Sequence, residues 1–250
     1  GAEMRAHITA FKDSLEALAA ANIKTICYNF MPILDWTRTN LRARQPHGGA
    51  AMRFDLIDFA VFDLHILRRA DAAESYSAAQ RAAAAERFHA LSDDGKKQLR
   101  HNIIAGLPGA NDSWSLEDVR ALLHSYEGVT RAQLRSHLID FLSEVVPCAE
   151  ALGLRLCCHP DDPPFSLLGL PRVMSSSADY SRVLNAVDVP ANGATLCTGS
   201  LGVAADFDGP AFVKTHGPRI HFAHLRNTRR IAGSDAGRPD FFEAPHLEGD

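Results

Sequence analysis

The feature that most constrains the fold is a regular alternation of helical and extended segments that begins near residue 130. Three segments carry apolar residues at helical spacing: 130–152, 178–187 and 207–216. Three shorter apolar runs predict strands: 154–158, 194–197 and 219–223. Short loops that join a strand, a helix and the next strand require parallel strands with the helices packed on the sheet. The sequence therefore predicts an α/β fold.

The segments before residue 130 extend this pattern only at their start. A helix over 7–22 and a strand over 23–30 are predicted, whereas the polar stretch 33–55 is expected to be a long loop. Further helices are predicted in four places: 56–69, 78–91, 93–104 and 115–126, with a break at 106–109. We interpret residues from about 42 to 130 as a mainly helical insertion within one domain that spans 1–250.

The number of predicted strands is too small for a closed barrel. Four strands are predicted, ending near 30, 158, 197 and 223, whereas a TIM (β/α)8 barrel has eight and needs about 250 residues. The chain begins inside a predicted helix, without Met, and no further strand is expected before Asp250. We therefore expect an incomplete barrel whose flanking strands lie outside this chain. Because open sheet edges invite pairing, we also expect either those strands or a homo-oligomer to cover them.

Charge, hydropathy and cysteine content exclude several classes of protein. The formal net charge is −4, which argues against a nucleic-acid partner because phosphate binding needs a basic face. The sequence has no apolar run of 18 residues, so no membrane span is expected. The five cysteines form an odd set and no signal peptide precedes them, which is typical of cytoplasmic thiols rather than a disulfide framework.

Three side chains that can bind a metal follow three consecutive predicted strands. They are His159, Cys197 and His224. The carboxyl ends of barrel strands converge on one mouth, so residues far apart in sequence can meet there. Two imidazoles and a thiolate suit a divalent transition metal, and no close pairs of ligands suggest a closed structural zinc site. The sequence predicts an open metal site.

The alternatives are structural. A single histidine at a strand end is more often a hydrogen-bonded loop residue, and only the shared position of the three favours a site. His221 is a rival on the last strand, but strand alternation puts it on the face opposite His224 if the strand extends that far. Cys157 and Cys158 are most simply core residues.

Polar residues near the same strand ends are candidates for binding substrate. Asp161 and Asp162 follow His159 and could act in acid–base chemistry, orient the metal ligands, or simply shape a turn. Asn29 and Arg38 follow the first strand, and Arg226 follows the last. The two arginines could clamp a carboxylate bidentately, or form salt bridges instead. Asp35 nearby is a possible helix cap.

At these residues the chain resembles the mannonate dehydratase family. The similarity rests on long motifs in the right order, which extend through nearly the whole chain: CYNFMP at 27–32, DWTRT at 35–39, NIIAGLPG at 102–109, HPDDPP at 159–164, GLPR at 169–172, NG at 192–193, CTGS at 197–200 and HFAHLR at 221–226. One departure is Asn40, where relatives often carry Asp.

The resemblance implies a TIM barrel of the xylose-isomerase-like kind. It also implies the dehydration of D-mannonate to 2-keto-3-deoxy-D-gluconate in hexuronate breakdown, with Mn²⁺ or Fe²⁺. Residues matching His159, Cys197 and His224 are metal ligands in that family. The fourth ligand, an Asp in an Arg-Pro-Asp-His-Gly motif, and a catalytic His beside it are expected beyond Asp250, so base and acid are not assigned within this chain.

Two other functions are compatible with the same residues. Another metal-dependent barrel enzyme, such as a sugar isomerase or epimerase, would share the strand-end ligands and differ in its product. A truncated, non-catalytic barrel would bind a sugar acid without turnover. The partner in every case is a small sugar acid, with no nucleic acid and no membrane.

Overall fold

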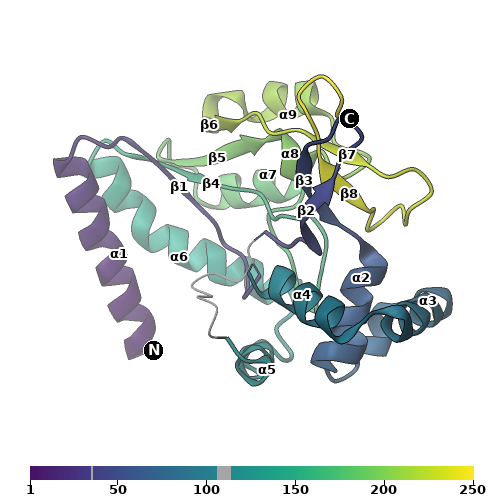
Figure 1. Ribbon diagram of the computed structural model, residues 1–250. Coiled ribbons are helices and arrows are strands. Elements are labelled where there is room, and N and C mark those ends of the chain that lie inside the picture. Colours follow the sequence, from purple (N-terminus) through teal and green to yellow (C-terminus); the bar gives the residue numbers. More distant parts are fainter. Residues whose placement is uncertain (35, 106–113) are drawn as a thin grey trace.

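The computed structural model describes residues 1–34, 36–105 and 114–250, and contains two four-stranded sheets (Figure 1). Asp35 and the predicted helix break at 106–109 lie outside the described residues. One sheet is parallel, with strand order β1-β4-β5-β6, and the other is antiparallel, with order β2-β3-β8-β7. Within the described part of the chain, no helix is both long and apolar enough to cross a membrane.

The parallel sheet consists of the four strands that the sequence predicts. Its strands are β1 (Thr25–Tyr28), β4 (Arg155–Cys158), β5 (Asn192–Cys197) and β6 (Ile220–His224). The register pairs Cys158 with Ala194 and Cys197 with His224. All six residues of β5 are buried, because this strand lies between two neighbours in the sheet and is covered by helices.

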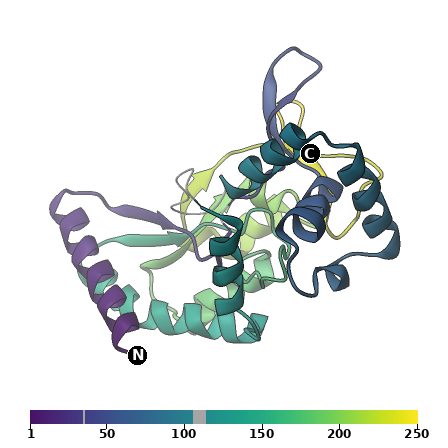
Figure 2. The same cartoon turned by 60° about the horizontal axis from the view of Figure 1, so that its bottom comes forward.

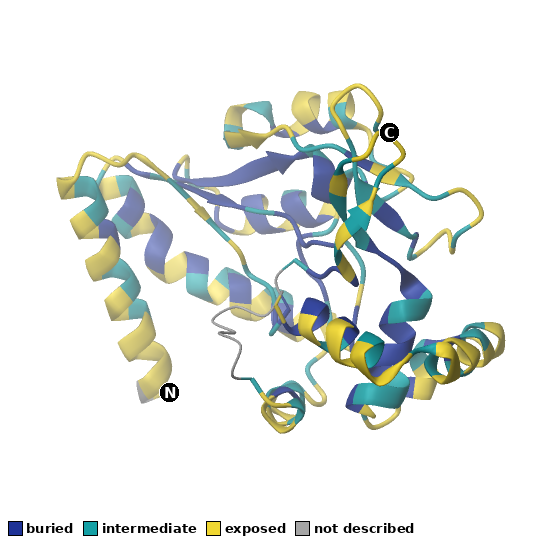
Figure 3. Cartoon of the chain, viewed as in Figure 1, coloured by how far each residue is buried: buried dark blue, intermediate teal, exposed yellow. Residues whose placement is uncertain are grey.

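Helices on one face of this sheet build the main hydrophobic core. They are α1 (Ala2–Ala20), α6 (Arg131–Ala151), α7 (Ser177–Ala186) and α9 (Gly209–His216), which is followed by the 3₁₀ turn η3 (Gly217–Arg219). Figure 3 shows that α1 is largely exposed, with partly buried residues along one stripe, where Leu15 joins the core. Helix α6 begins at Thr130, whose hydroxyl forms a capping box with Gln133, and ends before Gly153, which has φ +67°.

The parallel sheet is curled. Residues of the edge strands β1 and β6 approach within 8 Å between Cα atoms, although β4 and β5 separate them in the sheet. Cys27 of β1 and Phe222 of β6 face one cavity on the inner side. The carboxyl ends of the strands therefore surround a common space, which is the geometry that brings strand-end residues together.

The predicted insertion is mostly helical. It contains α2 (Leu56–Val61), the π-helix η1 (Phe62–Leu67), the 3₁₀ turn η2 (Ala72–Ser75), α3 (Ala78–Ala90), α4 (Asp93–Ile104) and α5 (Leu116–Ser125). Serine caps start three of these helices: Ser77, Ser92 and Ser115. A second core joins the insertion to the antiparallel sheet, where the rings of Phe54 and Phe241 stack with centroids 5.6 Å apart.

Two expectations about the chain were wrong. The stretch 33–55 is not a simple loop, because it contains the hairpin β2 (Asn40–Arg44) and β3 (Ala50–Phe54), which projects from the molecule in Figure 2. The region after residue 224 also contains strands, β7 (Thr228–Arg230) and β8 (Phe241–Glu243). β7 pairs with β8, and β8 joins this hairpin to β3, which is nearly 190 positions away in the sequence, so local patterns carry no signal for that junction.

Candidate metal centre

The structure brings His159, Cys197 and His224 together. Cys197 and His224 are the last residues of neighbouring strands, and His159 directly follows β4. One ligand atom from each residue lies within 4.8 Å of the others. Cys197 Sγ is 3.5 Å from His224 Nδ1, and the two imidazole centroids are 5.9 Å apart. Among the described residues, this is the cluster of histidines, cysteines and acids with the spacing of a metal site.

The surroundings prepare these groups to bind a cation. His159 Nδ1 lies 2.8 Å from the carbonyl oxygen of Pro160, which can only accept a hydrogen bond. Nδ1 therefore carries the ring proton and leaves the Nε2 lone pair available, as in most metal-bound histidines. Cys197 Sγ accepts a hydrogen bond from the backbone N–H of Ser200 at 3.4 Å. Both contacts favour the ligand form of the side chain.

The charges at the site favour a thiolate. Burial alone would raise the pKa of the Cys197 thiol, but a hydrogen bond from His159 and the charge of Arg226 outweigh burial and lower it. Burial lowers the pKa of His224, and the nearby charges of Arg226 and His159 lower it further. Burial would lower the pKa of His159, but the contact with Cys197 raises it, so a divalent transition metal would bind the thiolate and the two imidazoles by displacing the proton of this pair. The residues present therefore fit such a metal.

His221 lies away from this cluster. The strand β6 extends to His224, so alternation separates the two histidines as predicted. His221 Nε2 is 2.9 Å from the carbonyl oxygen of Pro190, at the opposite end of β5. The side chain packs against Gly193, where any Cβ would collide with the imidazole ring. Its contacts are structural.

A buried network of two arginines and two carboxylates lies beside the histidines. Arg38 donates to both carboxylate oxygens of Asp162, at 3.0 and 3.2 Å, and Arg226 Nη1 donates to Asp162 Oδ2 at 2.6 Å. Glu243 Oε1 accepts from Arg38 Nη2 at 2.7 Å, and Glu243 Oε2 lies 3.1 Å from Arg226 Nε. Burial would raise the pKa of Asp162, but the charges of Arg38 and Arg226 hold it well below the usual range.

This network changes how the predicted substrate-binding residues can act. Arg38 is fully buried, and its guanidinium also stacks over the Phe241 ring at 4.7 Å. The hydrogen bonds of Arg38 and Asp162 are therefore made to protein groups, although both residues also line the cavity beside the candidate ligands. Asp161, the neighbouring acid, accepts hydrogen bonds from the Met174 N–H and the Ser175 hydroxyl, both at 2.7 Å. These bonds give Asp161 a role in folding the loop after β4.

A cavity of about 440 Å³ opens over the network and the candidate ligands. Its wall includes His159 and His224 together with Asn29 and Arg226. Phe222 adds an apolar side that is 47% exposed. The space therefore combines donors of hydrogen bonds, a cationic group and possible metal ligands, as a site for a small polar acid requires.

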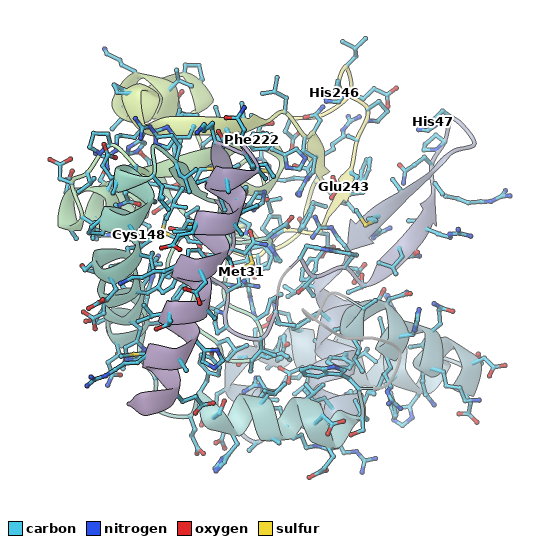
Figure 4. The ribbon with its side chains drawn as sticks, turned by 90° about the vertical axis from the view of Figure 1, so that its left-hand side faces the viewer. Met31, His47, Cys148, Phe222, Glu243 and His246 are labelled. Atoms are coloured by element: carbon cyan, nitrogen blue, oxygen red, sulfur yellow. The ribbon has the colours of Figure 1, made fainter. Side chains whose placement is uncertain are left out.

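Glu243 is the residue that the sequence analysis missed. Figure 4 shows Glu243 at the end of β8. The same view shows His47 at the tip of the neighbouring β2–β3 hairpin. The available signal is the spacing of Phe241 and Glu243, which puts both on one face of a short strand where they contact Arg38 from two directions. That signal required recognising β8 as a strand.

The fold and the site together define an α/β protein with a candidate metal centre at the carboxyl ends of a curled parallel sheet. Comparison with known proteins identifies the family. A family model described as D-mannonate dehydratase (UxuA) matches residues 2–250, and the chain belongs to this family.

Named relatives and a solved structure agree with this assignment. The chain is 51% identical over 247 residues to a mannonate dehydratase of Rhizobium meliloti (strain 1021), a match that covers 98% of this chain and 61% of the relative. It is 45% identical over 246 residues to a mannonate dehydratase of Saccharophagus degradans, covering 98% and 60%. The crystal structure of mannonate dehydratase from Streptococcus suis serotype2 matches with a TM-score of 0.68 and 27% identity, over 98% of this chain and 56% of that one. The chain thus spans about 60% of the length of these curated relatives.

Proposed function

We propose that this chain forms the metal-binding and carboxylate-binding part of a D-mannonate dehydratase. The reaction is the removal of water from D-mannonate to give 2-keto-3-deoxy-D-gluconate, a step of hexuronate breakdown. The observation that carries the proposal is the convergence of His159, Cys197 and His224 at the ends of three neighbouring strands. Family membership supports the choice of substrate.

The proposed cofactor is one Mn²⁺ or Fe²⁺ ion held by His159, Cys197 and His224. When bound, the ion supplies a Lewis acid that polarises the substrate and favours loss of the proton at C2. The donor set itself supports the proposal, because imidazole and thiolate groups suit first-row transition metals better than Ca²⁺ or Mg²⁺.

The side chains of this chain bind and orient the substrate in this proposal. Arg226 extends into the cavity wall and binds the carboxylate of the sugar acid. Asn29, which directly follows β1 and lines the same cavity, hydrogen-bonds a hydroxyl group of the sugar acid in this proposal. Asp162 and Arg38 contribute by holding Arg226 in place, since Asp162 contacts both arginines. The base and the acid of the reaction are not assigned to residues of this chain.

We also propose that the curled sheet is part of a (β/α)8 barrel, and that the protein works as a homo-oligomer in the cytoplasm. The curl of the parallel sheet and the likeness to the Streptococcus suis structure support the barrel. Covering the open strands β1 and β6 would protect unpaired backbone groups, which supports an assembled protein.

Metal binding tests the proposal most directly. Titration of the protein with Co²⁺, followed through the thiolate-to-cobalt absorption, should show one site per chain. Co²⁺ affinity should fall at least tenfold in each of three variants, His159→Ala, Cys197→Ser and His224→Ala. His221→Ala is the control and should leave the affinity unchanged, because His221 is on the same strand as His224 but contacts the carbonyl oxygen of Pro190 instead. Equal Co²⁺ affinity in all four variants would exclude this centre.

Product analysis separates the enzymatic alternatives. With Mn²⁺ present, D-mannonate should yield a 2-keto-3-deoxy acid, and a chelator should abolish the reaction. An isomerase or epimerase would instead convert a substrate without loss of water, and a binding protein would retain D-mannonate unchanged.

A further inference from the structure

Glu243 lies between the buried Arg38 and the partly buried Arg226. Its Oε1 accepts hydrogen bonds from Arg38 Nη2 at 2.7 Å and Arg38 Nε at 3.3 Å, and its Oε2 is 3.1 Å from Arg226 Nε. The Glu243 side chain is 17% exposed, so water screens these contacts only in part. Through Glu243, the antiparallel sheet contacts the residues that line the cavity.

The side chain of Arg226 is confined on three sides. Asp162 holds Nη1 at 2.6 Å, and Glu243 lies beside Nε. Gly199 lies against the aliphatic part: a Cβ there would be 2.8 Å from Arg226 Cβ and closer still to Nε, so any larger residue would displace the side chain. The guanidinium can therefore adopt few orientations.

One nitrogen of this confined group is left without a partner. Arg226 Nη2 is buried and makes no hydrogen bond to the described residues, and Nε is close to Glu243 but not aligned for a hydrogen bond. A buried donor without an acceptor is costly, and natural sites tolerate it where a ligand completes the bonding. Arg226 lines the cavity that also contains His159 and His224.

Net charge alone does not attract an acid to this point. The two arginines and two carboxylates of the network cancel. An incoming carboxylate therefore depends on the direction of the free N–H groups more than on a positive field. Asp162 by itself, through a single bond to Nη1, would let the guanidinium turn.

We propose that Glu243 is a positioning residue, which orients Arg226 so that its free Nη2 edge can bind the carboxylate of the sugar acid. This inference rests on the proposed function. It predicts that loss of the Glu243 charge weakens binding of a sugar acid more than binding of the neutral polyol of the same configuration. Glu243 makes no hydrogen bond to the candidate metal ligands among the described residues, and its charge acts only on His224, so metal affinity should change less than the affinity for the sugar acid.

The first measurement needs no substrate. Hydrogen exchange of the Arg226 Nε–H, followed by proton–nitrogen NMR with Arg226→Lys to assign the signal, reports how firmly the guanidinium is held. Glu243→Gln should accelerate this exchange at least tenfold, whereas Glu248→Gln, an exposed acid on the same segment, should leave it unchanged. Unchanged exchange in a folded Glu243→Gln variant would overturn the proposal.

The second measurement is calorimetric binding of D-mannonate and D-mannitol to the Mn²⁺-loaded chain. Glu243→Gln should raise the Kd for D-mannonate about tenfold, with little change for D-mannitol or Mn²⁺. If Glu243→Gln does not fold, Glu243→Asp, which keeps the charge but withdraws it from Arg226 Nε, should give the same selective loss. A D-mannonate affinity equal to that of the unaltered chain in either folded variant would refute the positioning role.

The two measurements separate two kinds of failure. If the unaltered chain binds no D-mannonate although Glu243→Gln accelerates the exchange, the proposed function fails and the contact between Glu243 and Arg226 stands. If D-mannonate binds and the exchange does not respond, the function survives and the positioning role is wrong.

Discussion

Replacing Arg38 by methionine should destabilise the protein strongly. Arg38 is fully buried and makes two hydrogen bonds to Asp162, whose side chain is only 2% exposed. Methionine fills much of the same space against Phe241 but removes the charge. Asp162 would keep one bond to Arg226, and Glu243 would lose its shortest partner. Removing one partner of a buried ion pair costs about 3–5 kcal/mol, because the remaining charge stays out of water without compensation.

Urea denaturation measures this loss. With a slope of about 2–3 kcal/mol per molar urea for a chain of this size, the midpoint should fall by roughly 1–2 M. Arg42→Met is the matched control, since Arg42 is exposed on β2 and should change stability by less than about 0.5 kcal/mol. If Arg38→Met lowers the free energy of unfolding by less than about 1 kcal/mol, water or a rearrangement must compensate the charge of Asp162. The network would then not hold Arg226 rigidly.

Three further outcomes follow from the fold. Leu142→Ala should cost about 2–5 kcal/mol in a urea titration, because Leu142 is fully buried between α6 and the sheet. Thr130→Ala should cost about 1 kcal/mol by losing the cap of α6. Burial lowers the pKa of His216 below its ordinary 6.5, so the unfolded state binds the proton more readily and stability should fall as pH drops through about 6.5. His216→Gln should flatten that pH dependence of the urea midpoint, and an unchanged slope would contradict it.

The parallel sheet and the three candidate ligands could be predicted because each depends on local signals. β5 is buried along its whole length, and its second half, 194–197, was recognisable as a short strand between two predicted helices. Once the strands are parallel, their carboxyl ends must meet, so His159, Cys197 and His224 were predicted to converge without knowledge of any contact. The parity that separates His221 from His224 held because β6 extends to His224.

The antiparallel sheet could not be predicted in the same way. In β2, arginines alternate with Leu41 and Ala43. The surrounding polar residues and glycines are typical of a loop, so this short alternation was not recognised as a strand. The strands β7 and β8 have three residues each, too few to show a period. They pair with each other, and β8 joins them to β3, where Arg53 and Phe242 are paired although they lie nearly 190 positions apart. Such long-range pairing is decided by packing and not by local sequence.

The two arginines illustrate a limit of reading single residues. From the sequence, Arg38 and Arg226 were predicted either to bind a substrate carboxylate or to form salt bridges within the protein, and these roles were treated as alternatives. In the structure both guanidinium groups contact protein carboxylates, yet the buried Nη2 of Arg226 has no hydrogen-bond partner among the described residues. The ion pairs with Asp162 and Glu243 thus restrict the orientation of the Arg226 guanidinium, whose Nη2 can still donate a hydrogen bond. A salt bridge of this kind can serve binding by fixing direction, because a preorganised donor loses less entropy when the ligand arrives than a free one would.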